Sequence, residues 1–292
     1  MKESKALSLI SILIMYIIAG AVGFIVYFNL PFKYYWSLLI ADIASTAIIF
    51  IFSCIFKNAS CYDAYWSVAP LVIAIALLIK GPINSVRLML SISVILWAIR
   101  LTINWIYTFD NLCWIDWRYK NIKEKTKIFY PIVNFLGIHL VPTLVVYCCI
   151  LPLVYVFYNN VELNAFVIIF FILSILSFTM QGIADYEMHR FRKNKNSTFI
   201  RNGLWKYSRH PNYLGEIMMW WSIGLASVIA LGFKEYYPLL VGAFLNTLLF
   251  LFISIPLAEH HQASRKEGFD EYKAETRMLL PIYKRKKNVK QK

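Results

Sequence analysis

Long stretches without any charged residue limit what this sequence can fold into. Residues 6–32 and 128–161 contain no Asp, Glu, Lys or Arg. A helix that crosses a membrane needs about 20 consecutive, predominantly apolar residues. Because lipid offers no hydrogen bonds to the backbone, such a segment must satisfy its own N–H and C=O groups, as a helix does. The stretches therefore predict transmembrane helices, and they exceed the core of a cleavable signal peptide, which is about 7–15 residues long.

Composition places the whole chain in the same class. Hydrophobic residues make up 59% of the 292 residues and charged residues 16%, with a mean hydropathy of +0.57. Soluble domains contain about 45–50% apolar and about 25% charged residues. These values exclude a disordered chain, a coiled coil and an ordinary soluble domain.

Eight apolar runs predict an all-α polytopic membrane protein with about eight transmembrane helices. The third run is short for a span, and the N-terminus would change sides if this run only dipped into the membrane. The fifth run holds one long helix, with expected kinks at Pro142 and Pro152. The runs are 6–32, 34–56, 64–79, 84–109, 128–161, 163–184, 213–233 and 236–258.

The loops predict how the chain is oriented. Three loops rich in Lys and Arg, 117–127, 190–209 and 265–292, alternate with the almost uncharged turns 159–162 and 234–237. Cytoplasmic loops of membrane proteins carry an excess of Lys and Arg. We therefore expect these loops and both termini in the cytoplasm, in a bacterial plasma membrane or, in a eukaryote, the endoplasmic reticulum. The same rule accounts for the net charge of +14 without a nucleic-acid partner.

The five cysteines do not predict a metal site, because no pair has the spacing of zinc ligands or of a redox motif. We expect membrane-buried thiols and no bound metal. No Gly/Ser-rich linker divides the chain. We therefore expect one helical membrane domain, in which the transmembrane helices of residues 1–59 precede a larger part, residues 60–292.

Ionisable side chains inside transmembrane runs are costly and mark functional sites by default. In the fourth run, Trp97, Arg100, Asn104 and Tyr107 fall on one helical face, because they are three or four residues apart. This stripe lines a cavity or a helix interface, where Arg100 could pair with a carboxylate such as Asp63. Asp63 opens the third run, where it either caps a helix or holds a proton beside a cavity.

Two further groups of polar residues flank the sixth and seventh runs. Asp185, His189 and Arg192 share one helical face, although a plain stop-transfer sequence would look similar. The segment 209–216, Arg-His-Pro-Asn-Tyr-Leu-Gly-Glu, is the sharper signal. Its Pro can begin a helix, and the free N–H groups there, with Arg and His beside them, favour binding of a phosphate. The alternative is a basic, aromatic belt at the membrane interface.

The segment 209–216 resembles the signature of the steroid 5α-reductase superfamily, most nearly an uncharacterised branch that also has Asp-x-x-Trp-Ser, here Asp63-Ala-Tyr-Trp-Ser67. The resemblance covers about residues 60–283. It implies a multi-span enzyme that binds NADPH on the cytoplasmic side and adds hydride to the β-carbon of an α,β-unsaturated ketone in a steroid-like or other lipid. It makes residues 60–292 the reductase-like part, with a cofactor-binding half at about 180–283.

The resemblance also implies roles for individual residues. Asp63 matches the acid at the substrate carbonyl, Trp97 the carbonyl-facing Tyr and Arg100 the Arg that follows, so these three are the expected catalytic residues. An indole N–H donates a hydrogen bond but cannot lend a proton, so Trp97 is a departure from the family pattern. The implied cofactor-binding residues are Gln181, Asp185, Arg192, Arg209, His210, Asn212, Tyr213, Glu216 and His261 (or, in place of the last, His260), and Asn104, Tyr107 and Trp220 are expected to line the substrate.

Other functions compete with this reading. Membrane methyltransferases of the isoprenylcysteine type, which use S-adenosylmethionine, share Arg-His-Pro-x-Tyr and a late Glu, for which Glu259 and Glu271 are candidates. Asn212 and Glu216 favour the reductase, and the chain has no Gly-x-Gly-x-x-Gly of a Rossmann domain. A non-catalytic lipid-binding protein on the same fold is a further alternative. A transporter is disfavoured, because the charged residues gather on one side of the membrane.

The predicted orientation can be tested by cysteine labelling in a variant without native cysteines. A cysteine at position 2 should resist a membrane-impermeant maleimide in intact cells, because the N-terminus is expected in the cytoplasm. A cysteine at position 160, in an uncharged turn, should react and serves as the control. Labelling at position 2 would contradict the eight-span arrangement.

Overall fold

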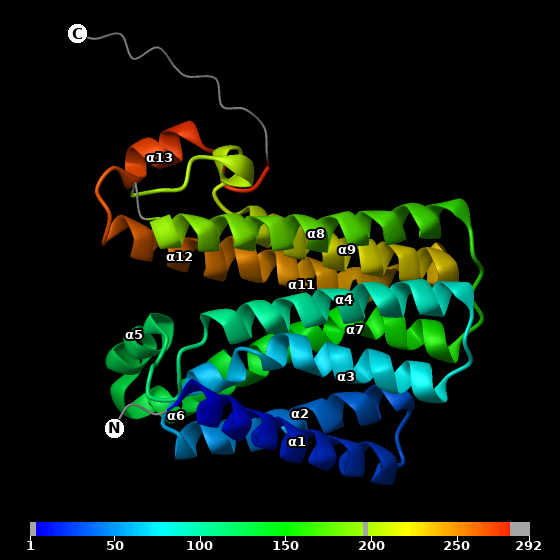
Figure 1. Ribbon diagram of the computed structural model, residues 1–292. Coiled ribbons are helices and arrows are strands. Elements are labelled where there is room, and N and C mark those ends of the chain that lie inside the picture. The colour runs from blue at the N-terminus through cyan, green and yellow to red at the C-terminus, as the bar shows by residue number, and fades with distance from the viewer. Residues whose placement is uncertain (1–3, 195–197, 281–292) are drawn as a thin grey trace.

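Eight helical segments that are long and apolar enough to cross a membrane lie side by side in the protein (Figure 1). The computed structural model describes residues 4–194 and 198–280, and this part of the chain contains helices and no strands. The predicted class, an all-α polytopic membrane protein with about eight spans, is therefore confirmed.

Five spans are single helices, and three, Ala59–Lys80, Trp117–Tyr158 and Phe233–Ala263, are assembled from several helical pieces. Short 3₁₀ turns cover Ala59–Tyr62, Lys127–Phe129, Gly203–Lys206 and Tyr237–Leu240, and π-helical segments cover Asn134–Leu140 and Phe250–Ser254. The α-helices are α1 (Lys5–Asn29), α2 (Tyr34–Ile55), α3 (Tyr65–Lys80), α4 (Ser85–Thr108), α5 (Trp117–Thr126), α6 (Tyr130–Val133), α7 (Val141–Tyr158), α8 (Ala165–Asn194), α9 (Pro211–Leu231), α10 (Phe233–Tyr236), α11 (Val241–Leu249), α12 (Ile255–Ala263) and α13 (Phe269–Glu275).

The third run belongs to a longer helical segment than the sequence indicates. With the 3₁₀ turn that precedes α3, the third helical segment covers Ala59–Lys80, which is 22 residues and long enough to span. As a result, the start of α1 and helix α13 lie at the same end of the bundle, together with α5 (Figure 1). That this end faces the cytoplasm remains a prediction from the basic loops.

Two basic segments that we expected to be loops are helical. Residues 117–126 form α5, which begins at Asp116, whose side chain accepts a hydrogen bond from the Arg118 N–H group. Helix α8 continues past residue 184 to Asn194. Apolar runs cannot reveal these helices, because both are rich in charged residues and project beyond the apolar part of the bundle.

A π-helical segment precedes each of two prolines near the start of an α-helix. Asn134–Leu140 lies directly before α7 and Pro142, and Phe250–Ser254 lies directly before α12 and Pro256. Proline lacks an N–H group and clashes with the carbonyl group four residues earlier, so a wider turn relieves the clash. The irregularity expected at Pro142 is therefore present, whereas α7 stays α-helical through Pro152.

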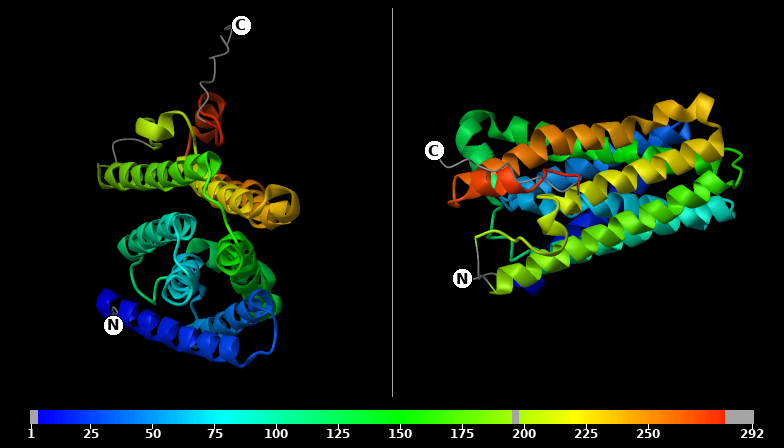
Figure 2. Two further views of the ribbon diagram at one scale, coloured as in Figure 1. Left: turned by 90° about the vertical axis from the view of Figure 1, so that its right-hand side faces the viewer. Right: turned by 90° about the horizontal axis from the view of Figure 1, so that it is seen from above.

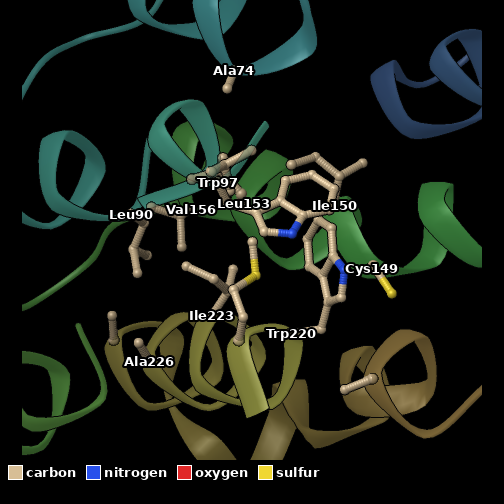
Figure 3. Packing of buried hydrophobic residues seen from close by; sticks show 14 of the residues in the cluster. Ala74, Leu90, Trp97, Cys149, Ile150, Leu153, Val156, Trp220, Ile223 and Ala226 are labelled. Carbon is tan, nitrogen blue, oxygen red and sulfur yellow. The ribbon is translucent and has the colours of Figure 1, made fainter. Parts of the chain in front are cut away.

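The helices form three layers (Figures 1 and 2). Helices α8, α9, α11 and α12 form one outer layer, α3, α4 and α7 form the middle, and α1 and α2 form the other outer layer. The main core lies between the first two layers, where Trp97, Ile150, Leu153, Trp220 and Ile223 are almost fully buried (Figure 3). The contact between these layers positions the candidate site.

One glycine allows two helices of the core to approach closely. A Cβ atom on Gly242 of α11 would lie 2.2 Å from the carbonyl group of Cys148 in α7. By contrast, a Cβ atom on Gly20 of α1 would meet nothing within 4 Å.

We therefore expect Gly242→Ala to force α11 away from α7 and to lower the free energy of unfolding by about 1–3 kcal/mol, the usual cost of overpacking. The thermal unfolding midpoint of purified protein in detergent measures the change. Gly20→Ala is the matched control, because it makes the same substitution in a helix without a clash. Equal midpoints for the two variants would show that the α7–α11 contact is not this close.

Candidate functional site

A buried carboxylate is held by three indole groups where α3, α4 and α9 meet. Glu216 is 5% exposed. Its Oε1 atom accepts hydrogen bonds from Trp66 Nε1 at 3.4 Å and Trp220 Nε1 at 3.0 Å, and its Oε2 atom accepts one from Trp97 Nε1 at 2.8 Å. The rings of Trp97 and Trp220 also pack edge to face, with centroids 4.9 Å apart (Figure 3). These donors fix the carboxylate, and no cation of residues 4–194 and 198–280 forms an ion pair with it.

The next polar contact along α4 joins it to α8. Arg100 donates to Asp185 Oδ2 at 2.6 Å and to Gln181 Oε1 at 2.5 Å. The partner of Arg100 is therefore Asp185, and the pairing with Asp63 that we considered is wrong. The side chain of Asn212, on α9, lies against the same Asp185 carboxylate.

Two buried donors beside this ion pair have no protein partner in the described part of the chain. They are Arg100 Nε and Gln181 Nε2. A buried polar atom without a hydrogen bond costs about 1–3 kcal/mol, so it usually indicates a missing partner such as a ligand or water. The pair therefore offers two hydrogen-bond donors to a polar ligand between α4, α8 and α9.

The predicted polar stripe of α4 continues outward along α8. Asn104 Oδ1 lies 2.7 Å from His189 Nε2, and the Tyr107 ring packs on the His189 ring with centroids 4.6 Å apart. The stripe is thus a helix interface as well as the wall of a site. Trp97 contacts Glu216 of α9, and Arg100 and Asn104 contact the polar face of α8. We call this set of contacts the polar row.

Asp63 lies apart from the polar row, in a cluster with α5. The Tyr119 hydroxyl group donates a hydrogen bond to its Oδ1 atom, and Arg118 lies 3.5 Å from its Oδ2 atom. Arg118 also binds Asp116 at 2.8 Å. The N-cap of α3 is Ala64, and Asp63 lies one residue before it, so Asp63 is not the capping residue that we considered. Trp66, in the first turn of α3, reaches Glu216, so the two acids lie on either side of the start of α3.

Arg209 and His210 have a protein partner where we expected a phosphate. Arg209 Nε lies 2.8 Å and His210 Nε2 lies 3.1 Å from Glu259 Oε1, and Tyr213 stacks on the His210 ring. Arg209 also donates to the carbonyl oxygen of Thr276 at 2.5 Å. These contacts fasten the start of α9 to α12 and to the segment after α13. A phosphate would have to share this position with Glu259.

Positive charges gather beyond the ends of α8 and α12. Arg192 is exposed near the end of α8, and Arg265 and Lys266 follow α12. Burial, together with the positive charges of Arg192 and Arg265, lowers the pKa of Lys266. Such mutual repulsion is relieved by a bound anion, so this basic cluster is a candidate phosphate site. His261 is stacked nearby on Trp117, with centroids 3.6 Å apart, and contacts Arg265.

A small aromatic cluster holds the segments outside the membrane in place. Tyr272 of α13 stacks on Phe199 with centroids 5.0 Å apart, and its hydroxyl group lies 3.5 Å from the Trp205 carbonyl oxygen. Burial raises the pKa of Tyr272 to about 12, so the side chain stays neutral at physiological pH. The cluster fixes the chain on either side of the basic cluster.

The structure thus brings most of the expected site residues into one region. Asp63 is separated from the polar row by Trp66, and Arg192 and His261 lie at the outer end of the bundle. The sequence analysis missed several partners because they lie in segments that we expected to be loops. The only indication in the sequence was that aromatic and charged residues are mixed in those segments. The missed residues are Arg118, Tyr119, Arg265 and Lys266. Trp66 and Glu259 were noted only as parts of motifs, without their partners Glu216 and Arg209.

Comparison with known proteins gives two relatives of low identity. A "Probable 7-dehydrocholesterol reductase" of Acanthamoeba polyphaga mimivirus is 26% identical over 133 residues, which are 39% of this chain and 28% of the relative. An uncharacterised protein of Schizosaccharomyces pombe is 26% identical over 202 residues, which are 60% of this chain and 59% of the relative. The chain therefore spans less than two thirds of the length of either relative. No solved structure matches it.

A family model matches residues 49–276, which include the polar row, the Asp63 cluster and the basic cluster. Within residues 4–194 and 198–280, no group of three or more His, Cys, Asp or Glu residues could hold a metal ion. Because the match covers most of its length, the chain belongs to the family described as "Protein of unknown function (DUF1295)", which is related to steroid 5α-reductase-like proteins.

Proposed function

We propose that this protein is an NADPH-dependent membrane reductase that acts on a carbon–carbon double bond conjugated to a carbonyl group in a steroid-like or other lipid. One observation carries the proposal. The buried polar row offers two donors without a protein partner, Arg100 Nε and Gln181 Nε2, and the same helix pair leads to the basic cluster. The relative named as a probable 7-dehydrocholesterol reductase supports a membrane reductase.

The residues present fit a dinucleotide. Arg100 Nε and Gln181 Nε2 can donate to a carboxamide or ribose oxygen, which removes the cost of leaving them unpaired. At the outer end, Arg192, Arg265 and Lys266 suit phosphate groups, since charge-assisted hydrogen bonds are the strong ones. When bound, NADPH supplies the hydride. Asn212 and Asp185 would help to orient it, and we propose that Arg209, His210 and Glu259 close the site from the α9 side.

Trp97 has a positioning role in this proposal. Its N–H group is already donated to Glu216, so it has no second donor for a substrate carbonyl group. The Trp that replaces the family's Tyr would therefore hold Glu216 in place, together with Trp66 and Trp220.

The donor to the substrate would be Asp63 in its protonated form. The Tyr119 hydroxyl group points its only proton at Asp63 Oδ1, so it has none left for a substrate. As negative charge develops on the substrate carbonyl oxygen, the Asp63 carboxyl group can donate a hydrogen bond and then its proton, while Tyr119 and Arg118 hold it in position. Asp63 then supplies the proton that an indole cannot lend.

The first test is cofactor choice. Arg192→Ala should weaken NADPH binding by about 10- to 100-fold and leave NADH binding nearly unchanged, because a charge-assisted contact contributes about 1.5–3 kcal/mol. Titration calorimetry on protein in detergent measures both affinities. Arg201→Ala is the control, since Arg201 is exposed and pairs with Glu275 instead. An equal loss for the two dinucleotides would exclude Arg192 as a contact to the additional phosphate.

The second test separates chemistry from binding. Asp63→Asn and Tyr119→Phe should each lower turnover of a 4-ene-3-ketosteroid by about 100-fold, as losing one oxyanion donor does, with NADPH affinity within a few-fold. Glu216→Gln should mainly weaken NADPH, because its amide N–H group would face the indole donors. If Asp63→Asn keeps full turnover, Asp63 serves only as the partner of Arg118.

A methyltransferase is the second candidate, because one contact favours it. Arg209 and His210 both bind Glu259, and these are the residues that the isoprenylcysteine type shares with this chain. Tight binding of S-adenosylmethionine without dinucleotide binding would replace the reductase by this activity. Binding of lipid alone would indicate a non-catalytic protein.

For the reductase, we propose that residues 60–292 form the catalytic part and that the basic end faces the cytoplasm.

A further inference from the structure

A cavity of about 530 Å³ lies between α1, α2 and α3, away from the polar row. Cavities that hold small ligands commonly measure about 300–1,000 Å³. Its wall is mainly apolar and includes small residues, among them Gly20, Ala41 and Ala69. It lies beside Tyr65, the neighbour of Trp66 in α3, whereas Trp66 itself contacts Glu216. The cavity is therefore separate from the candidate reductase site.

One acid lines this cavity. Asp42 of α2 is 6% exposed, and its Oδ1 atom accepts a hydrogen bond from the Tyr65 hydroxyl group at 2.6 Å. Apart from Tyr65, no side chain that the structure describes donates a hydrogen bond to Asp42. An ionisable side chain inside a membrane span is costly and marks a functional site by default.

The surroundings of Asp42 restrict which ligand can form a hydrogen bond with its carboxyl group. An anionic headgroup would be repelled by the carboxylate. Tyr65 has already used its one hydroxyl proton, so it cannot supply a second donor to Asp42. Lys80 is the cation that lines the cavity, and its Nζ atom lies over the Phe28 ring at 3.8 Å from the centroid. A neutral hydroxyl group provides a donor without bringing another charge into the apolar wall.

We propose that this cavity binds a lipid alcohol, whose hydroxyl group donates a hydrogen bond to Asp42 Oδ2 and whose apolar body packs between α1 and α3. A sterol and a linear prenol share this chemistry, and the experiment below distinguishes them. The site does not depend on the reductase proposal, because it shares no residue with the polar row.

The direct test is photocrosslinking of purified protein with two diazirine probes, a sterol and a linear prenol, each with a free hydroxyl group. We expect one of them to label cavity-lining residues of α1, α2 and α3, as mapped by mass spectrometry. Excess of the same unlabelled alcohol should compete at least about tenfold better than its methyl ether, which has no donor. Equal competition by the ether, or labelling spread over all lipid-facing helices, would overturn the proposal.

Variants separate the cavity from the general lipid surface. Gly20→Phe should abolish the labelling, because a side chain at this position enters open space and fills the cavity. Ile25→Phe is the matched control on the exposed face of α1 and should leave labelling unchanged. NADPH affinity should be the same in both variants, so failure here is distinguishable from failure of the reductase proposal. Retained labelling in Gly20→Phe with unchanged NADPH affinity would overturn the site.

Substitutions at the polar end identify the recognised group. Asp42→Asn should weaken labelling about tenfold, because a neutral acceptor forms a weaker hydrogen bond than a carboxylate. Tyr65→Phe should keep or strengthen labelling, since it frees the second oxygen of Asp42. Stronger competition by a long-chain amine than by the alcohol would overturn the alcohol in favour of a cationic lipid, as would unchanged labelling in Asp42→Asn.

Discussion

The arrangement of this protein depends on how one carboxylate is accommodated inside a membrane bundle. Glu216 has no ion pair within the described part of the chain, and three indole N–H groups from α3, α4 and α9 donate hydrogen bonds to it instead. Each indole also fills a large apolar volume, so the same side chains that neutralise the cost of the acid build the core between two layers. Because no single helix could supply all three donors, the carboxylate fixes the mutual position of three spans.

From that fixed point, the remaining polar contacts follow the length of α4 and α8. Arg100 pairs with Asp185, and Asn104 contacts His189, each about one turn further out. A row of this kind has a double effect. It selects one register of α4 against α8, since a shifted register would leave charges unpaired in an apolar setting. It also leaves Arg100 Nε and Gln181 Nε2 without partners, which a purely structural interface would avoid.

The sequence predicts the spans well but the site only in part, because it shows which residues are charged but not which residues they contact. Long apolar runs identify all eight spans, because only a membrane requires them, and helical spacing identifies the stripe of Trp97, Arg100 and Asn104. Spacing cannot name the partner of a charged group, so Asp63 was a candidate for Arg100 although Asp185 is nearer. Helix α5 is polar, and therefore its contribution to Asp63 had no signal in hydropathy.

The limits of the family match divide the chain into a part that contains the polar row and a part that contains Asp42. The match begins at residue 49 and ends at residue 276, where the Thr276 carbonyl oxygen accepts a hydrogen bond from Arg209. Every residue of the polar row lies within these limits. Asp42 lies before them, as does all of α1, so the cavity beside Asp42 combines α3, which the match covers, with two helices that lie largely outside it. The proposed reductase site therefore lies wholly inside the matched region, whereas the proposed lipid-alcohol site takes its acid from outside it.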